Sequence, residues 1–446
     1  MSDSRHRFGI GGIAGFLTLC GGQTVSMLGS RISSFGLGVW IYQETTSATR
    51  FALSAFFRAV PFILVSPLAG ALVDRWDRRR TMILADTGAA FTMLCLAGIL
   101  WGQRIELWHI YLAMGMVALF DAFQSPAFEI SMGLMIPREH LARASGLIYF
   151  GAEGTRILAP PLAGMLLVIV HLYGLLVIDF VTFFFSVLVL LWIRLPKTRE
   201  TPESVKHRGS LGREMVFGWH YIRQRPGLFG LLSLFAFTNF TLGIVIVLFT
   251  PLVLSFTSAA MLGLVMGFSA GGGMAGGALM AFWGGPKRKV SGILGFMVLQ
   301  GSILLLGGLR PSVPLVSGAA FTFMFCAPIV AGCSQAMWLR KVPSDVQGRV
   351  FGIRRMVAVS AMPLAYLAAG PLSDFVFEPL LLPGGPLADT VGRYVGVGQG
   401  RGTGLLLIVL GVVTLTAVGI AALYRPLRNL EEELPDAPTL AVEEAS

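Results

Sequence analysis

The charged segment at residues 70–80 decides the fold, and it reads Gly70-Ala71-Leu72-Val73-Asp74-Arg75-Trp76-Asp77-Arg78-Arg79-Arg80. It lies between two apolar runs, at residues 50–73 and 81–101. Each run is long enough to cross the roughly 30 Å hydrocarbon core of a bilayer as a helix. A short basic segment between two such helices is typical of a cytoplasmic loop. The stretch therefore predicts two membrane spans joined on the cytoplasmic side.

Apolar runs of this kind recur along the whole chain of 446 residues, of which 54% are hydrophobic and only 13% are charged. Soluble domains usually carry about 25% charged residues. We therefore expect an all-α membrane protein with twelve transmembrane helices. The predicted spans are 14–42, 50–73, 81–101, 106–135, 141–170, 172–194, 228–255, 260–283, 290–309, 313–338, 346–372 and 403–424.

The distribution of basic residues orients these spans. With the N-terminus inside, the segments assigned to the cytoplasm hold 26 of the 34 Lys and Arg residues, and the outer loops hold five. An excess of basic residues in cytoplasmic loops is the general rule for membrane proteins. It accounts for the net charge of +10 without nucleic acid as a partner. Both termini are predicted to be cytoplasmic.

A long polar segment divides the chain into two similar halves. Gly70-Ala71-Leu72 and Trp76 recur 207 residues later, and Arg143, Gly146 and Gly164 recur 206 residues later. Duplicated halves are how many secondary transporters build two bundles around a central site. The predicted organisation is a six-helix bundle at 1–194, a cytoplasmic linker at 195–227, a second six-helix bundle at 228–424 and an acidic cytoplasmic tail at 425–446. Residues 431–446 of that tail are expected to be disordered.

The segment at 70–80 resembles the signature between the second and third spans of the major facilitator superfamily. That signature is Gly, any residue, Leu, any residue, Asp, Arg, two residues and a basic pair; Asp77 replaces its usual second glycine. The resemblance implies the major facilitator fold, with two pseudo-symmetric six-helix bundles. The residues that carry it, which we expect to form a cytoplasmic gate, are Gly70, Leu72, Asp74, Arg75, Arg78 and Arg79.

Physical reasons support a gate at this loop. Gly70 permits close approach of a neighbouring helix. The Asp74 carboxylate is favoured beside a helix N-terminus, where backbone N–H groups are unsatisfied. The resemblance implies that this neighbour is the eleventh span and that the contact holds the cytoplasmic side closed. The alternative is that the arginines only anchor the topology.

A second resemblance lies in the fifth span, which contains Ala159-Pro160-Pro161-Leu162-Ala163-Gly164. It is similar to the Gly-Pro-x-x-Gly-Gly motif of the antiporter branch, with alanine at two glycine positions. Small residues allow close packing, and proline bends the helix. Ala159, Pro160 and Gly164 are therefore candidate antiporter-motif residues. The chain as a whole resembles the twelve-span exporter branch, which includes macrolide-efflux and enterobactin-exporter proteins.

Several ionisable residues lie inside the predicted spans, where a charge normally faces a partner or a water-filled cavity. Arg31 and Asp121 lie near the bilayer midplane by helix rise, and we expect them to pair and to couple transport. Glu153 and Arg156, three residues apart on one helix face, form a second candidate pair. Arg58, a further candidate for the coupling cavity, is expected nearer the outer surface.

The second half offers amides in place of charges. Asn239, Gln300 and Gln335 are candidate substrate-binding residues. Protonatable groups in the first half and a mostly apolar second half suit proton coupling with a hydrophobic or amphipathic cargo. The structural alternative is that the buried charges form ion pairs between helices.

Other motifs point away from enzymes and cofactors. Residues 267–271 match the G-x-S-x-G pattern of serine hydrolases, but they lie inside a predicted span, whereas that elbow needs a strand-to-helix turn. Gly263, Gly267 and Gly271 are better interpreted as a helix-packing face. The sequence has no P-loop pattern, and its six histidines are scattered. We expect no metal, no cofactor and no enzymatic activity, with a proton gradient as the energy source.

The sequence thus predicts a bacterial inner-membrane protein, competent as a monomer, whose partners are the lipid bilayer and a small-molecule substrate. The cargo is a drug, a macrolide or a siderophore-like molecule exported by proton antiport. A facilitator, importer or lysolipid mover of the same fold is the alternative within transport. A membrane receptor or scaffold without transport, and less favourably an intramembrane enzyme using Ser269, are the alternatives outside it.

The predicted topology is testable by fusions of alkaline phosphatase and green fluorescent protein. Fusions near Arg78 and near Arg208 should both report a cytoplasmic location, because both residues lie in basic loops on the same side. Reporters that place the two residues on opposite faces of the membrane would contradict the twelve-span topology.

Overall fold

The computed structural model describes residues 12–73, 76–135, 141–193, 211–343 and 346–435, and these residues form helices and no β-strand. The chain divides into two compact units. Unit 1 comprises residues 1–199 and 257–267, and unit 2 comprises residues 200–256 and 268–446. The all-α prediction is confirmed over the described residues.

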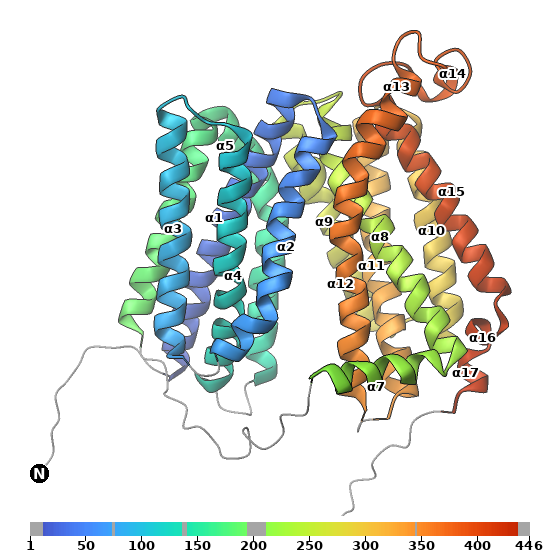
Figure 1. Cartoon of the computed structure of the whole chain (residues 1–446), viewed down its shortest axis with the longest axis horizontal. Coiled ribbons are helices and arrows are strands. Elements are labelled where there is room, and N and C mark those ends of the chain that lie inside the picture. The colour runs from blue at the N-terminus through green and yellow to red at the C-terminus, as the bar shows by residue number, and fades with distance from the viewer. Residues whose placement is uncertain (1–11, 74–75, 136–140, 194–210, 344–345, 436–446) are drawn as a thin grey trace, which may run out of the picture. The chain divides into compact units, whose positions relative to one another are not determined.

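Unit 1 is a bundle of long helices that lie side by side (Figure 1). Its helices are α1 (Gly12–Thr45), α2 (Ala48–Val73), α3 (Arg78–Trp101), α4 (Leu107–Met135) and α5 (Leu141–Trp192). The 52 residues of α5 are broken at His171, whose φ of 56° and ψ of −176° are not helical. A straight helix of that length would be about 78 Å long, more than twice the hydrocarbon thickness. The break falls where the sequence predicts the boundary between spans 5 and 6.

Ten helices among the described residues are long and apolar enough to cross a membrane. They include α5 as one, although His171 divides it. They do not include α1, which carries a run of polar residues through its middle, among them Gln23, Ser26 and Arg31. The twelve-span count and the cytoplasmic termini are consistent with these elements, and they stay predictions.

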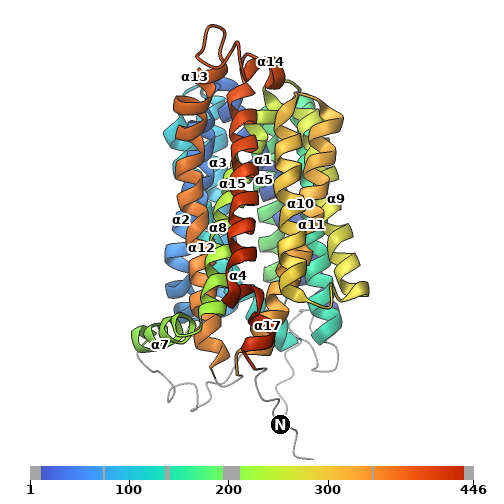
Figure 2. The same ribbon diagram turned by 90° about the vertical axis from the view of Figure 1, so that its right-hand side faces the viewer.

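Unit 2 is a second helical bundle, in which α10 packs against both α11 and α15 (Figure 2). Its core includes the fully buried Trp338, packed with Met297 and Ile329. The long helices of this half of the chain are α8 (Pro226–Leu254), α9 (Ala259–Trp283), α10 (Lys289–Leu309), α11 (Val313–Lys341), α12 (Gln347–Pro371) and α15 (Arg401–Leu423). The first part of α9, up to Gly267, belongs to unit 1.

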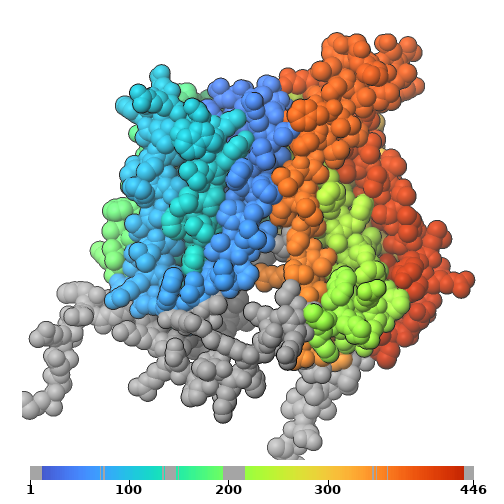
Figure 3. Space-filling view, in the orientation of Figure 1, coloured from blue at the N-terminus to red at the C-terminus, as the bar shows by residue number. Residues whose placement is uncertain are grey.

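The predicted linker contains a helix that the sequence analysis did not anticipate, α7 (Leu211–Arg223). It lies on the surface of unit 2 (Figure 3), and its buried Gly218 packs against the backbone carbonyl of Arg349 on α12. Val216 and Trp219 are exposed on its outer side. Exposed apolar and aromatic side chains beside basic ones are typical of a helix in the membrane interface.

The segment between α12 and α15 is folded. It forms η2 (Leu372–Phe377), α13 (Glu378–Leu381) and α14 (Gly392–Val395). The Glu378 carboxylate accepts hydrogen bonds from the backbone N–H groups of Gly400 and, at 3.1 Å, Thr403. These donors belong to the first turn of α15, where a carboxylate is favourable. Glu378 therefore caps α15.

The beginning of the tail is also folded, as α16 (Arg425–Arg428) and α17 (Leu430–Glu433). Leu430 is 2% exposed. The Glu431 carboxylate accepts a hydrogen bond of 3.0 Å from the Val290 N–H group, and the Glu431 carbonyl accepts one of 2.8 Å from Lys341. The prediction of disorder is wrong for residues 431–435, because the contacts of Glu431 and the buried Leu430 before it hold the segment; residues 436–446 lie outside the described residues.

Small residues let α5 and the first part of α9 pack closely within unit 1. A Cβ atom added to Gly263 would lie directly against the carbonyl oxygen of Pro160, and one added to Gly164 would lie 2.7 Å from the Ala259 carbonyl oxygen. A Cβ atom added to Gly267 would contact the Pro161 ring at 3.0 Å. The predicted packing face is confirmed for Gly263 and Gly267, whereas Gly271 has no atom within 4 Å of such a Cβ.

We expect Gly263→Ala to destabilise the protein by roughly 1–3 kcal/mol, because the added methyl group collides with the rigid backbone of Pro160. Gly271→Ala on the same helix is the matched control: it meets open space and should be neutral or stabilising by up to about 1 kcal/mol. Thermal unfolding of both purified variants in detergent measures the difference. Equal melting temperatures would contradict the described packing of α5 on α9.

Candidate functional site

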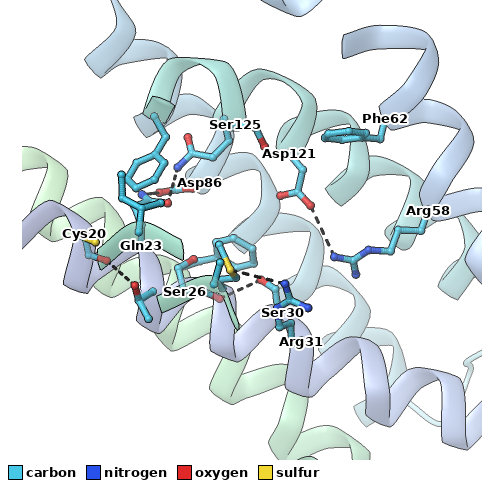
Figure 4. A pocket seen from close by; sticks show the side chains of 17 residues that line it. Cys20, Gln23, Ser26, Ser30, Arg31, Arg58, Phe62, Asp86, Asp121 and Ser125 are labelled. Atoms are coloured by element: carbon cyan, nitrogen blue, oxygen red, sulfur yellow. Dashed lines mark hydrogen bonds and ion pairs between the residues drawn. The ribbon is translucent and has the colours of Figure 1, made fainter. Parts of the chain in front are cut away.

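A cavity of about 300 Å³ lies inside unit 1, between α1, α2, α3, α4 and α5 (Figure 4). Four charged side chains line it, two basic and two acidic, together with several polar and apolar ones. The charged residues are Arg31, Arg58, Asp86 and Asp121. Ionisable groups within a membrane span normally face such a cavity, so this is the candidate site.

Helix α1 supplies the polar wall of the cavity. Gln23, Ser26 and Ser30 follow one another at spacings of three and four residues, and Arg31 lies next to Ser30. Residues at these spacings share one helix face. The polar character of α1 is thus concentrated where the helix faces the cavity.

Asp121 on α4 pairs with Arg58 on α2, with 3.9 Å between the Asp121 Oδ2 and Arg58 Nη2 atoms. Arg58 also donates a hydrogen bond to the Ser34 hydroxyl on α1. The predicted Arg31–Asp121 pair is therefore wrong, whereas Arg58, a predicted coupling residue, lines the cavity and is the ion-pair partner of Asp121. At 3.9 Å the ion pair is close to the limit of direct contact, so it is a loose one.

Arg31 lies in the same cavity, and no carboxylate of the described residues lies within ion-pair distance of it. Its Nη2 atom donates to the Met27 sulfur, at 4.0 Å. Its Nε atom is buried and has no hydrogen-bond partner within the described part of the chain. A guanidinium group carries five N–H donors, so most of the donors of Arg31 are available to a ligand.

Asp86 on α3 is a wall residue that the sequence analysis missed. It is 2% exposed, and its Oδ2 atom accepts hydrogen bonds from the Ser186 hydroxyl at 2.7 Å and the Gln23 amide at 3.2 Å. The Gln124 amide in turn donates to the Gln23 side-chain oxygen at 2.8 Å. This network joins α3, α5, α1 and α4. Asp86 could have been identified from the sequence, because it is a carboxylate inside an apolar run, as Asp121 is.

Asp179 lies outside the cavity wall and ties α5 to α1. It is fully buried, and it accepts a hydrogen bond of 3.1 Å from the Ser30 hydroxyl and another from the Ser33 hydroxyl. All of its described partners are neutral hydroxyl groups. Asp179 therefore serves to hold the two helices together.

Glu153 and Arg156 form the predicted ion pair on α5, with 2.9 Å between Glu153 Oε2 and Arg156 Nε. Both lie close in sequence to Ala152, which lines the cavity. The contact is confirmed, and its role in coupling stays a prediction.

The three amides predicted to bind substrate engage protein groups in unit 2. Asn239 donates to the Phe235 carbonyl at 2.9 Å, and the buried Gln300 donates to the Phe323 carbonyl at 3.2 Å. Gln335 accepts a hydrogen bond of 2.7 Å from Arg354. These contacts stabilise the helices, and a role in cargo binding stays a prediction.

The gate motif is described in part. Asp74 and Arg75 lie outside the described residues. Within unit 1, no described atom lies within 4 Å of a Cβ added to Gly70, and the expected close approach of the eleventh span stays a prediction. Arg79 donates to the carbonyls of Leu190 and Leu191, at 2.8 and 2.6 Å, and so binds the C-terminal end of α5.

Asp77, which replaces the usual glycine of the gate signature, has a local role. Its side chain accepts a hydrogen bond of 2.9 Å from the Arg80 N–H group, and it is the N-cap of α3. An N-cap aspartate satisfies one of the unpaired donors of the first helical turn. The departure from the signature therefore helps to begin the third span.

The cavity offers positioned charges and amides for binding. Over the described ranges, no three His, Cys, Asp or Glu side chains gather closely enough to hold a metal ion. What the wall can do is recognise polar groups of a ligand and exchange a proton at a carboxylate, since intramembrane carboxylates commonly serve as proton relays.

Comparisons with known proteins agree on one family. The family model described as Major Facilitator Superfamily matches residues 19–366. The chain is 24% identical to Macrolide efflux protein A of Streptococcus pyogenes over 376 residues, which cover 80% of this chain and 89% of that protein. It is 23% identical to Multidrug efflux pump Tap of Mycobacterium tuberculosis, over 75% of this chain and 81% of the pump.

Solved structures share the fold. A bacterial homologue of the human lysosomal transporter Spinster, in an inward-facing and unoccupied conformation, has a TM-score of 0.67 at 15% identity and covers 93% of this chain and 97% of its own. The nucleoside transporter NupG has the same TM-score at 11% identity, over 91% of this chain and 98% of its own. At these identities the likeness concerns the fold.

We expect Asp179→Ala to destabilise the protein by roughly 1–3 kcal/mol, because the half-buried Ser30 hydroxyl and the buried Ser33 hydroxyl lose their shared acceptor. Asp179→Asn keeps an acceptor oxygen and should be affected less. Thermal unfolding of the purified variants measures both effects. An Asp179→Ala protein that unfolds at the wild-type temperature would exclude this role.

Proposed function

The chain belongs to the Major Facilitator Superfamily, and we propose that it exports an amphipathic small molecule from the cytoplasm in exchange for protons. The family and the ten apolar helices make it a multi-pass membrane transporter. Under the proposal, its two halves alternate in opening a central site to each side of the membrane, as in other transporters built from repeats.

Two relatives support export as the direction. Macrolide efflux protein A and Multidrug efflux pump Tap are both named for efflux, and both match three quarters of this chain or more. Macrolides are accordingly the first cargo to test. All of these relatives are bacterial, which supports the bacterial inner membrane as the location, with both termini in the cytoplasm.

The single observation that carries the proposal of proton exchange is the partial exposure and the long ion pair of Asp121. Its side chain is 36% exposed, and its one ion pair, to Arg58, is 3.9 Å long. Such a partly exposed, loosely paired carboxylate can lose its partner and take up a proton more easily than a buried, tightly held one. Asp86 is 2% exposed and accepts two neutral hydrogen bonds. Of the two wall carboxylates, Asp121 is therefore the better suited to exchange.

Proton exchange at Asp121 gives a simple cycle. In one step the deprotonated carboxylate, paired with Arg58, is available to a cargo from the cytoplasm. In the other step a proton from outside neutralises Asp121 and the cargo leaves. The pair with Arg58 is loose at 3.9 Å, and a charge inside the membrane is costly without a close partner. The empty and deprotonated state is therefore disfavoured during the conformational change. That penalty couples the two fluxes.

We expect Asp121→Asn to reduce gradient-driven transport at least tenfold while the protein stays folded, because asparagine keeps the shape and cannot exchange a proton. The assay uses proteoliposomes with an acidic lumen and measures accumulation of erythromycin and of ethidium. Ethidium is permanently charged, so it does not accumulate by itself in response to a pH gradient.

Protein-free liposomes and the ionophore nigericin define the background. Asp389→Asn is the matched control variant, since Asp389 is exposed in unit 2 far along the chain from the cavity residues. Its transport should equal that of the wild type. If Asp121→Asn transports as fast as the wild type, Asp121 has no role in coupling. If transport by the wild-type protein does not depend on the pH gradient, a facilitator is favoured.

A further inference from the structure

Arg31 and Asp121 line one cavity and do not pair with each other (Figure 4). The ion pair of Asp121 is with Arg58, and the side-chain contact of Arg31 is with Met27. The cavity thus presents a cationic group and an anionic group to whatever occupies it. Arg31 has hydrogen-bond donors, and Asp121 has acceptor oxygens, that do not bind any described protein residue.

The unused capacity of Arg31 is for an acidic group. Its buried Nε atom has no hydrogen-bond partner among the described residues, and the Met27 sulfur is a weak acceptor. The guanidinium fork matches the two oxygens of a carboxylate in a bidentate contact. A buried donor left unsatisfied is costly, so an occupant that satisfies it gains affinity.

The unused capacity of Asp121 is for a basic group. No hydrogen bond to its carboxylate is found in the described part of the chain, and its one ion pair is 3.9 Å long. Asp86, the other wall carboxylate, is already held by Ser186 and Gln23. An ammonium group of an occupant would therefore be received at Asp121.

The rest of the wall fits an apolar body of modest size. Phe62, Phe128, Ile148 and Phe183 line the cavity beside the polar groups. Its volume of about 300 Å³ lies at the lower end of the range of small-molecule sites. The wall therefore combines two opposite charges with an aromatic surface.

We infer that the cargo is an amphipathic zwitterion, whose acidic group binds Arg31 and whose basic group binds Asp121. The inference rests on the proposed function, because it takes this cavity as the cargo site. It also explains why export would exchange for protons: the basic group of the cargo and the proton occupy the same carboxylate in turn. The acidic group balances Arg31 only while cargo is bound.

The probes are Nε-dansyl-lysine, which is zwitterionic at its α-carbon, and two derivatives that each lack one charge. The methyl ester lacks the carboxylate, and the Nα-acetyl derivative lacks the amine. Binding to the full-length protein in an uncharged detergent is measured by dansyl fluorescence, with protein-free micelles subtracted. The zwitterion should bind about ten- to a hundredfold more tightly than either derivative, the range expected for one hydrogen-bonded charge.

Two variants separate the two contacts. Arg31→Gln should lose the preference for the zwitterion over the methyl ester and keep its preference over the acetyl derivative. Asp121→Asn should lose the preference for the zwitterion over the acetyl derivative and keep its preference over the methyl ester. Arg31→Lys should restore part of the first preference, because a lysine keeps the charge without the fork. Arg104→Gln, at an exposed loop position, removes an arginine outside the cavity and should bind like the wild type.

A further variant guards against misfolding of Arg31→Gln. Met27→Glu places a carboxylate beside Arg31, because the Met27 sulfur already contacts its Nη2 atom. The internal carboxylate should occupy the guanidinium and abolish the preference over the methyl ester. Met27→Gln introduces a side chain of the same size as glutamate but without the charge. It should leave the preference for the zwitterion over the methyl ester intact.

Equal binding of the three probes by the wild type, or absence of binding by all three, would overturn the inference. An Arg31→Gln protein that keeps the full preference over the methyl ester would do so as well. These outcomes leave gradient-driven transport of ethidium or erythromycin intact, so proton antiport would stand. Conversely, loss of pH-driven transport with intact probe preferences would overturn antiport and leave the zwitterion site.

Discussion

The requirement that polar groups find partners away from water governs the interior of unit 1. In an apolar environment an unpaired charge or hydrogen-bonding group costs several kcal/mol. Asp179 meets the requirement with two serine hydroxyls of α1, and Asp86 meets it with Ser186 and Gln23. Arg31 does not meet it with the described protein groups. Where the requirement is left unmet, a ligand has something to bind.

The same interior separates structural polar groups from functional ones. The Asp179 contacts hold α5 against α1, and the close packing of Gly263 on Pro160 holds α9 against α5. Both sets of contacts are tight, and neither has to break or to exchange a proton during transport. The Arg58–Asp121 pair differs, because it is longer and borders the cavity. Rigid contacts around a loose pair are what a site needs if it is to bind and release ions repeatedly.

The sequence predicted the positions of the long helices well, because composition and helical length determine which segments can lie in lipid; even the break at His171 was anticipated. It did not predict the partner of Asp121. The helical rise gives the depth of a residue in the membrane, but it does not give the rotation of α2 about its axis, which turns Arg58 toward the cavity. Helix α7 and the folded start of the tail were missed because their stability comes from contacts with distant residues, such as Arg349 and Lys341. Asp86 could have been found by the criterion that found Asp121.

The central claim is that cargo and proton occupy the cavity of unit 1 in turn. Proton release on cargo binding tests it most directly. Purified protein in weakly buffered detergent is mixed with erythromycin, or with whichever compound proves to be transported, and a pH indicator follows the solution. The account predicts that the wild type releases protons when the compound binds, with less release as the starting pH rises. Saturable binding with no proton release at any pH would contradict it.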